Sequence, residues 1–379
     1  MWGAIIGDIV GSRFEFNNHK SKIFDFFGDD CFFTDDTVMT IAVAKALSEN
    51  EGKTSEELKN SVIYEMSSFA YKYQDAGYGN MFYNFLFYNP VPYNSFGNGA
   101  AMRISAAGEF CNSLEEVKKI SRVVTEVSHN HPEGIKGAEC VAVCIYLART
   151  GSAKEEIKIR VIENYYPEVK SMTCDGIRPD YVFDETCQRT VPQALTCFFE
   201  GDDFEGVIRN AISIGGDSDT IGAIAGSVAE AFYGVPDKII QTVREKYLSK
   251  DLLNTIDKII KYKEVQIMRK IMEYPYPLNL AADIIGDEPE YDFCGDKAKL
   301  LCENAEFISD YEAVICSLND EKLEAFVVKT YKELKDFDDV AAELNCTKDE
   351  LKNEIYPKVL RKLRQPSRSK FWWKYLKNI

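Results

Sequence analysis

Histidine is scarce in this chain, with 3 residues in 379. Three histidines are too few for a metal site built on imidazole ligands. The 11 cysteines are scattered, odd in number and never form a CxxC pair. This pattern argues against a disulfide framework and against a structural zinc site, and it predicts reduced thiols in a cytoplasmic protein.

Long hydrophobic runs are also missing. No stretch of about 18 uncharged apolar residues occurs, so the sequence predicts no transmembrane helix and no membrane partner. Residues 1–8 have no basic region and already include an acid, unlike a secretory signal peptide.

Positive charge is in deficit overall, since the net charge is −16. Residues 341–379 nevertheless hold ten Lys/Arg and four Asp/Glu, a net of +6, which leaves −22 for residues 1–340. An acidic body is a poor general nucleic-acid binder. The basic tail suits either contact with a polyanion or a solvated helix face.

Strand-like alternation is rare, and helical periodicity dominates, so we predict an all-α fold built as a large helical bundle. Segments 38–47, 134–147 and 221–232 are apolar on most sides, as expected for central helices. Prolines and acids between Lys270 and Asp292 indicate a boundary. We expect a main domain of residues 1–275 and a smaller helical domain of residues 276–379.

Helix starts and one long loop also follow from the sequence. Ser or Thr followed three residues later by Glu predicts four capping boxes, at Thr54/Glu57, Ser113/Glu116, Ser309/Glu312 and Thr347/Glu350. Segment 75–99 carries eight aromatic residues among glycines and prolines, and is predicted to be irregular but ordered.

Segment 215–220 reads GGDSDT and leads into an apolar helix. Its two glycines allow positive φ. Its two aspartates and its threonine offer hard oxygen ligands of the kind that Mg²⁺ and Mn²⁺ prefer. Asp and Thr are also common helix N-caps, so capping is an equal alternative for this segment alone. A second cluster, TDDT at 34–37, leads into another apolar helix and favours a metal site.

Near the N-terminus, Gly3, Gly7 and Gly11 recur at i+4 spacing in an apolar helical run, and Glu15 continues the stripe. Such a stripe predicts close approach of another backbone. The two acidic clusters together supply about six oxygen ligands, enough for a pair of Mg²⁺-like ions with positions left for water or substrate hydroxyls.

The order of five motifs resembles the ADP-ribosylglycohydrolase family. The motifs are GDxxGxxxE (7–15), FTDDT (33–37), SFGNGAAMR (95–103), SHNHPEG (128–134) and GGDSDTIxAIAGSVAEAFYG (215–234). The resemblance covers about residues 1–270. It implies an all-α fold with two Mg²⁺ or Mn²⁺ ions at the base of a cleft. There water would cleave the bond between ADP-ribose and an acceptor side chain of a protein.

Carried over by position, the resemblance also implies site residues. The metal ligands would be Thr34, Asp35, Asp36, Asp217, Asp219 and Thr220. The acid/base residues would be Glu15 and Asp36. The substrate-binding residues would be Ser95, Phe96, Gly97, Asn98 and His129. Two of these have simpler readings, because Glu15 could be a surface residue that ends the glycine helix and His129 a hydrogen-bonded structural residue. Arg103 suits a carboxylate or a phosphate equally and has no assigned role.

Two functions remain open at this point. The first is metal-dependent hydrolysis of the bond between ADP-ribose and an acceptor, which reverses ADP-ribosylation, with arginine favoured by analogy with bacterial members of the family. The second is a regulatory module that binds ADP-ribose without turnover. The complete carboxylate set favours the first.

The C-terminal segment 336–370 has the rhythm of a helix-turn-helix with a turn at residues 345–346. Its LRKLRQPSRSK end resembles region 4 of bacterial primary sigma factors, which implies contact with DNA or RNA polymerase. Pro357 should kink or end the second helix, and three acids lie on the face that would meet DNA. DNA, a protein partner and docking of the tail onto the chain itself are three alternatives.

Overall fold

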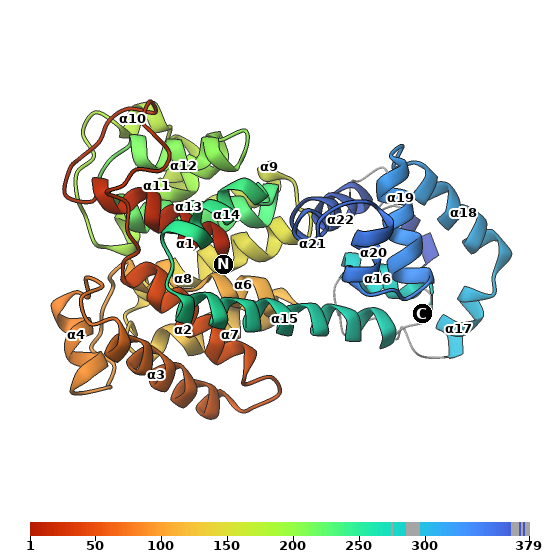
Figure 1. Ribbon diagram of the computed structural model, residues 1–379, viewed down its shortest axis with the longest axis horizontal. Coiled ribbons are helices and arrows are strands. Elements are labelled where there is room, and N and C mark those ends of the chain that lie inside the picture. Colours follow the sequence, from red (N-terminus) through yellow and green to blue (C-terminus); the bar gives the residue numbers. More distant parts are fainter. Residues whose placement is uncertain (274–275, 286–295, 365–370, 373, 376–379) are drawn as a thin grey trace. The chain divides into compact units, whose positions relative to one another are not determined.

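The computed structural model describes residues 1–273, 276–285, 296–364, 371–372 and 374–375. Over these residues the chain is helical, without strands, and its packing forms two compact units (Figure 1). Unit 1 comprises residues 1–148 and 153–260, and unit 2 comprises residues 149–152 and 261–379. The all-α prediction is confirmed. The predicted division into domains 1–275 and 276–379 concerns independent folding and stays a prediction.

Unit 1 is built from the helices in roughly the first two thirds of the chain. They are α1 (Trp2–Gly11), α2 (Asp35–Ser48), α3 (Ser55–Lys72), α4 (Asn80–Phe87), α5 (Gly99–Met102), α6 (Ser105–Phe110), α7 (Leu114–Glu126), α8 (Pro132–Arg149), α9 (Lys154–Asn164), α10 (Cys174–Ile177), α11 (Cys187–Glu200), α12 (Phe204–Ser213), α13 (Ser218–Tyr233), α14 (Asp237–Lys246) and the first half of α15 (Lys250–Glu273). Short 3-10 turns occupy Ser12–Phe14 and Pro167–Lys170.

The centre of unit 1 is the pair α1 and α13, which lie side by side (Figure 1). Their contact is a seam of facing glycines. A Cβ placed on Gly7 would overlap the backbone of Gly222, and a Cβ on Gly3 would overlap that of Gly226. The predicted close approach is therefore confirmed, and its partner is the helix that follows the GGDSDT segment. Since α1 is buried along its whole length, it also supplies apolar core on its other faces.

The three segments predicted to be central form the middles of α2, α8 and α13, and most of their residues are buried. The ten cysteines in the described part of the chain are free thiols, as expected. None of the helices in the described residues is long and apolar enough to cross a membrane.

Three of the four predicted capping boxes mark true helix starts. Thr54, Ser113 and Thr347 each accept a hydrogen bond from the backbone N–H three residues on. The prediction at Ser309/Glu312 is wrong, because both residues lie inside α18 (Ala305–Cys316), which the side chain of Asn304 caps. Asparagine is as good an N-cap as serine, so the helix starts after Asn304 and not at Ser309.

The segment predicted to be irregular, 75–99, contains the two-turn helix α4. Residues 80–87 have no glycine or proline, and Phe82, Phe85 and Leu86 repeat at helical spacing and are buried. Only the flanking parts are loops, so the prediction was too broad.

Unit 2 has its own core and consists of shorter helices. Besides α18 they are α16 (Leu278–Ile285), α17 (Asp296–Cys302), α19 (Glu321–Val327), α20 (Phe337–Glu343), α21 (Lys348–Glu350) and α22 (Tyr356–Arg364), with π-helical turns at Val328–Lys332 and Leu351–Ile355.

The helical rhythm expected near the C-terminus is present. Helix α20 is followed by a turn in which Asn345 has φ 51°, and then by α21. Pro357 does not end the second helix, which passes through the π-helical turn 351–355 into α22. The π-helical turn directly precedes α22, and Pro357 is the second residue of α22.

The described part of the basic tail packs on its own unit. Trp372 is fully buried, Phe371 stacks on Phe307 with ring centroids 5.6 Å apart, and the ammonium of Lys374 lies 2.8 Å from Asp310. These contacts correspond to docking on the chain itself. Residues 365–370, which carry most of the sigma-like motif, lie outside the described residues.

Candidate metal centre and substrate loops

Asp8 of α1 is a fully buried carboxylate that organises the start of α2. It accepts hydrogen bonds from the backbone N–H of Thr34 at 2.9 Å and of Thr37 at 3.0 Å, and from both threonine hydroxyls. Burial raises its pKa to about 6, although these hydrogen bonds act in the opposite direction. Asp8 had no predicted role. An acid inside an otherwise apolar helix was the signal that could have found it.

The start of α2 presents two adjacent aspartates. Thr34 is the N-cap, and its hydroxyl accepts from the N–H of Asp36. The Asp36 carboxylate accepts from the Thr220 hydroxyl at 3.2 Å through Oδ2, while its buried Oδ1 has no hydrogen-bond partner among the residues that the structure describes. Asp35 is half-buried, and its N–H donates to the carbonyl of Ala76 at 2.7 Å. The hydrogen bond between Thr220 and Asp36 therefore joins the cluster at 34–37 to the cluster at 215–220.

The GGDSDT segment turns sharply before α13. Gly215 and Gly216 have φ of 71° and 78°, the left-handed region that favours glycine. Asp217 occupies the N-cap position, yet its side chain caps nothing and accepts instead from the side-chain amide of Asn98 at 2.6 Å. The Asp217 side chain therefore makes no capping bond to α13, and its role as a metal ligand stays a prediction.

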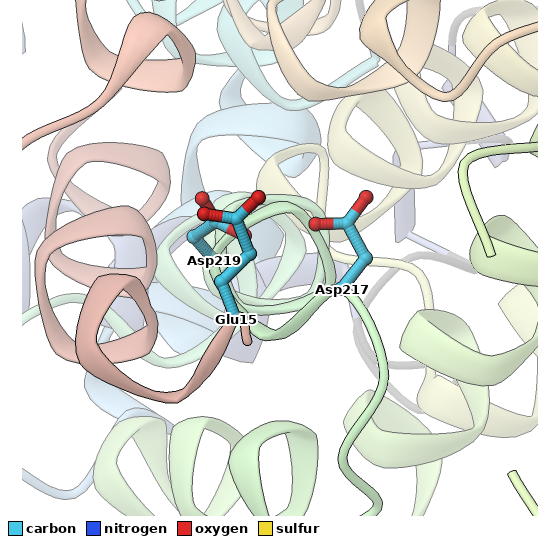
Figure 2. Close-up of side chains that lie close together, drawn as sticks. All are labelled: Glu15, Asp217 and Asp219. Atoms are coloured by element: carbon cyan, nitrogen blue, oxygen red, sulfur yellow. The ribbon is translucent and has the colours of Figure 1, made fainter. Parts of the chain in front are cut away.

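Three carboxylates meet at this point. Oxygen atoms of Glu15, Asp217 and Asp219 all lie within 4.8 Å of one another, and Figure 2 shows Glu15 reaching the two aspartates from a different segment of the chain. Burial, followed by repulsion from Asp219, raises the pKa of Glu15 to about 8. Burial also raises the pKa of Asp217 to about 6, and that of Asp219 well above its usual range.

Asp35 and Asp36 belong to the same acidic group. Burial is the main cause that raises the pKa of both well above the usual value, and repulsion from Asp219 comes next. The charged groups responsible for these shifts are other carboxylates. A buried cluster of like charges is stable only when it is protonated or bound to cations.

The donor set fits hard divalent cations. It is made of carboxylate and hydroxyl oxygens without sulfur or imidazole, and one of its buried oxygens, Asp36 Oδ1, has no partner within the described residues. The structure thus brings Asp36, Asp217, Asp219 and Thr220 together, with Thr34 and Asp35 at the same helix start, and it adds Glu15 to the oxygen donors.

The predicted substrate loop, 95–98, is held by a second segment, 184–187. The N–H of Asn98 donates to the carbonyl of Glu185 at 2.7 Å, and Gly97 forms an isolated bridge with Thr186. Ser95 accepts from the N–H of Gly97 at 3.1 Å. The Phe96 ring is 42% exposed and is therefore available to a ligand. The roles of these four residues in substrate binding stay predictions.

His129 is buried and neutral. Burial, followed by the nearby charge of Arg103, holds its pKa well below the usual value. Its Nδ1 lies 3.3 Å from the Arg103 guanidinium. Because arginine only donates, Nδ1 is the acceptor here and Nε2 carries the ring proton, near Gly97 and Gly99. These contacts hold the His129 ring against the substrate loop 95–98, and its role as a substrate contact stays a prediction.

Arg103, which had no assigned role, contacts the backbone and a hydroxyl rather than a carboxylate. It is fully buried, donates to the carbonyl of Gly99 at 2.6 Å and to the Ser128 hydroxyl at 2.8 Å, and lies over the Phe82 ring at 4.9 Å. It joins the substrate loop to the loop that carries His129.

The comparison with known families defines the class of protein. The ADP-ribosylglycohydrolase family profile matches residues 1–267, so the chain belongs to this family, whose members are hydrolases of glycosyl bonds. The resemblance of the catalytic part that the five motifs indicated is thereby confirmed, while that of the C-terminal segment to sigma factors stays a prediction.

Individual relatives are distant. Human ADP-ribosylhydrolase ARH3 is 24% identical over 331 residues, which covers 66% of this chain and 89% of the relative. ADP-ribosylarginine hydrolase Tri1 of Pseudomonas putida (strain GB-1) is 26% identical over 264 residues, which covers 62% and 69%. A solved structure described as an ADP-ribosylglycohydrolase-related protein complex is 20% identical with a TM-score of 0.53, covers 69% of this chain and 95% of its own, and shares the fold.

Proposed function

We propose that this protein is a metal-dependent hydrolase that cleaves the bond between ADP-ribose and an acceptor side chain of a modified protein, with arginine as the favoured acceptor. The observation that carries the proposal is the cluster of Glu15, Asp217 and Asp219, whose oxygens lie within 4.8 Å of one another, with Asp36 bonded to the neighbouring Thr220 hydroxyl. Two Mg²⁺ or Mn²⁺ ions would balance these charges and would supply the orientation of the ribose hydroxyls.

The acid/base residue in this proposal is Glu15. Burial and repulsion from Asp219 raise its pKa to about 8 in the metal-free protein, and bound cations would lower it. With cations bound, the Glu15 carboxylate would take a proton from the attacking water, and the carboxyl so formed would pass it to the leaving acceptor nitrogen or oxygen. Asp36 is the second candidate for this role.

The substrate loop complements this chemistry. Asn98 links the loop to Asp217 through its side-chain amide, so a ligand held by residues 95–98 is placed beside the carboxylates. Backbone N–H groups and the Ser95 hydroxyl suit pyrophosphate oxygens. Holding the sugar in a fixed position relative to the attacking water lowers the activation free energy of such reactions by a large fraction.

Support for arginine comes from the relatives named ADP-ribosylarginine hydrolase, in Pseudomonas putida and in Serratia proteamaculans. The test is a panel of arginine-, serine- and ester-linked ADP-ribosyl peptides, assayed with Mg²⁺, with Mn²⁺ and with a chelator. We expect release of ADP-ribose from the arginine peptide that stops on chelation. Metal-dependent ADP-ribose binding without turnover on any linkage would instead favour a regulatory binding module.

Targeting to DNA or RNA polymerase through the C-terminal segment has weaker support, because Phe371 and Trp372 are core residues of unit 2. Deleting this segment would remove that core and test folding rather than binding. Substitution of the exposed Lys358 by glutamate in the full chain is cleaner. If retention on duplex DNA and on RNA polymerase is unchanged, contact of either partner through Lys358 is rejected.

A further inference from the structure

The segment that carries Glu15 is tied to the turn that carries Asp217 and Asp219. Asn18 accepts a hydrogen bond from the N–H of Gly216 at 2.9 Å through its Oδ1. Lys20 donates from Nζ to the carbonyl of Ile214 at 2.5 Å and to that of Tyr181, also at 2.5 Å. Both side chains therefore hold the residues just before Asp217.

The two carbonyls that Lys20 binds suit a cation. Ile214 is the C-cap of α12, where helix carbonyls lack partners and the helix dipole is negative. Tyr181 belongs to a loop, and its ring packs against Gly216, so that a Cβ on Gly216 would overlap it. The ammonium thus joins three segments that are distant in sequence: the Glu15 segment, the Tyr181 loop and the GGDSDT turn.

A third link lies next to Glu15. Phe16, 84% exposed, stacks on Phe183 with ring centroids 5.8 Å apart. Phe183 is part of the same loop as Tyr181, and two residues later Glu185 accepts from the N–H of Asn98. The loop from 181 to 186 therefore contacts the Glu15 segment, the metal-site turn and the substrate loop.

The links bear on where Glu15 lies. Glu15 is half-exposed and follows the 3-10 turn 12–14, whereas Asp217 and Asp219 lie at the start of α13. Residues 16–20 after Glu15 are not helical, so side-chain contacts have to fix this segment relative to α13. The bonds of Asn18 to Gly216 and of Lys20 to Ile214 are placed to keep Glu15 beside the two aspartates (Figure 2).

We propose that Lys20, assisted by Asn18, is a positioning residue that holds Glu15 against Asp217 and Asp219 by fastening its segment to the GGDSDT turn. The inference rests on the proposed function for its catalytic consequence, but the tether itself is independent of which bond is cleaved.

The primary test replaces Lys20 with Met, which keeps the length and removes the ammonium. Hydrogen–deuterium exchange of the segment 13–20 in the metal-free protein should increase by about tenfold or more. The matched control is Lys22→Met, an exposed lysine two residues away, which should leave exchange unchanged. Lys20→Arg retains the charge and the donors and should restore slow exchange. Exchange in Lys20→Met equal to wild type would overturn the tether, whether or not the protein hydrolyses any substrate.

Function is tested in parallel. Mn²⁺ affinity, followed by electron paramagnetic resonance, and kcat on the arginine-linked peptide should each fall by about 10–100-fold in Lys20→Met, as for other residues that orient metal ligands, with KM nearly unchanged. In a Glu15→Gln background the same substitution should lower kcat by less than about twofold, because coupled residues are not additive. A full additional loss in that background would show that Lys20 does not act through Glu15. If Lys20→Met fails to fold, Asn18→Ala is scored by the same criteria.

Failure of the proposed function gives a different result. In that case the wild type would release ADP-ribose from no linkage, while the exchange of segment 13–20 would still respond to Lys20→Met.

Discussion

The glycine seam between α1 and α13 makes a sharp prediction for Gly7→Ala. A Cβ at this position would lie 2.6 Å from the N of Ala223 and would overlap the carbonyl of Gly222. Normal contacts of this kind exceed 3.4 Å, so one helix must move by about 1 Å against a packed core. Overpacking of this size lowers the free energy of unfolding by about 3 kcal/mol. The better helix propensity of alanine offsets about 1 kcal/mol of this loss.

The expected net loss is therefore about 2 kcal/mol, or a fall in Tm of roughly 4–8 °C for a unit of this size. Activity should fall as well, because Asp8 follows Gly7 directly and positions Thr34 and Thr37. Thermal unfolding by circular dichroism and kcat/KM on the ADP-ribosyl peptide measure both effects.

The matched control is Gly206→Ala in α12. There the added Cβ meets only the side chain of the N-cap Asp203, at 3.1 Å, and no neighbouring helix. This variant should be as stable as wild type or more stable, by up to about 1 kcal/mol. If Gly7→Ala is equally stable, the backbone contact between α1 and α13 does not exist as described, and the glycine seam is refuted.

Three further predictions concern the carboxylate cluster. Adding Mg²⁺ at about 100 times its Kd should stabilise the wild type by about 2.7 kcal/mol per site, seen as a rise in Tm, and Asp217→Asn should lose most of this rise; an equal rise in the variant would exclude Asp217 as a ligand. Glu15→Gln should lower kcat by about 10²–10⁴-fold and leave KM nearly unchanged, and retention of full activity would exclude it as the acid/base residue. The pKa values of Asp8 and Asp217, about 6 in the folded protein and 3.8 ordinarily, mean that the unfolded chain releases these protons first. The free energy of unfolding of the metal-free protein should therefore fall as pH rises from about 4 to 6, and urea titrations that show the opposite slope would contradict the buried cluster.

Much of the fold follows from local signals. Helical periodicity, capping residues and the stripe Gly3, Gly7 and Gly11 are properties of neighbouring residues, and the structure bears them out. The wrong prediction at Ser309 also comes from local signals. Asn304 and Ser309 are both possible N-caps, and only the packing of α18 decides between them. Helix α4 was missed because glycines and prolines on both sides hid a short amphipathic stretch.

The candidate site was predictable in its residue types but not in its contacts. Nothing local in the sequence indicates that the side chain of Asn98 reaches Asp217, or that Asp8 binds the start of the helix that begins with Asp35. These tertiary contacts span about 30 to 120 positions, and only the packing of α1, α2 and α13 defines them. Glu15 was predicted as an acid/base residue, and its carboxylate lies within 4.8 Å of those of Asp217 and Asp219.

The pairing of α1 with α13 limits how early in synthesis the centre of unit 1 can form. The two helices are separated by about two hundred residues, so their contact is among the least local in unit 1 and carries a high loop-closure entropy. At ribosomal rates of about 5–20 residues per second, the apolar α1 waits roughly 10–40 s for its partner. The carboxylate cluster, which includes Asp217 and Asp219 at the start of α13, can therefore assemble only after α13 has been made.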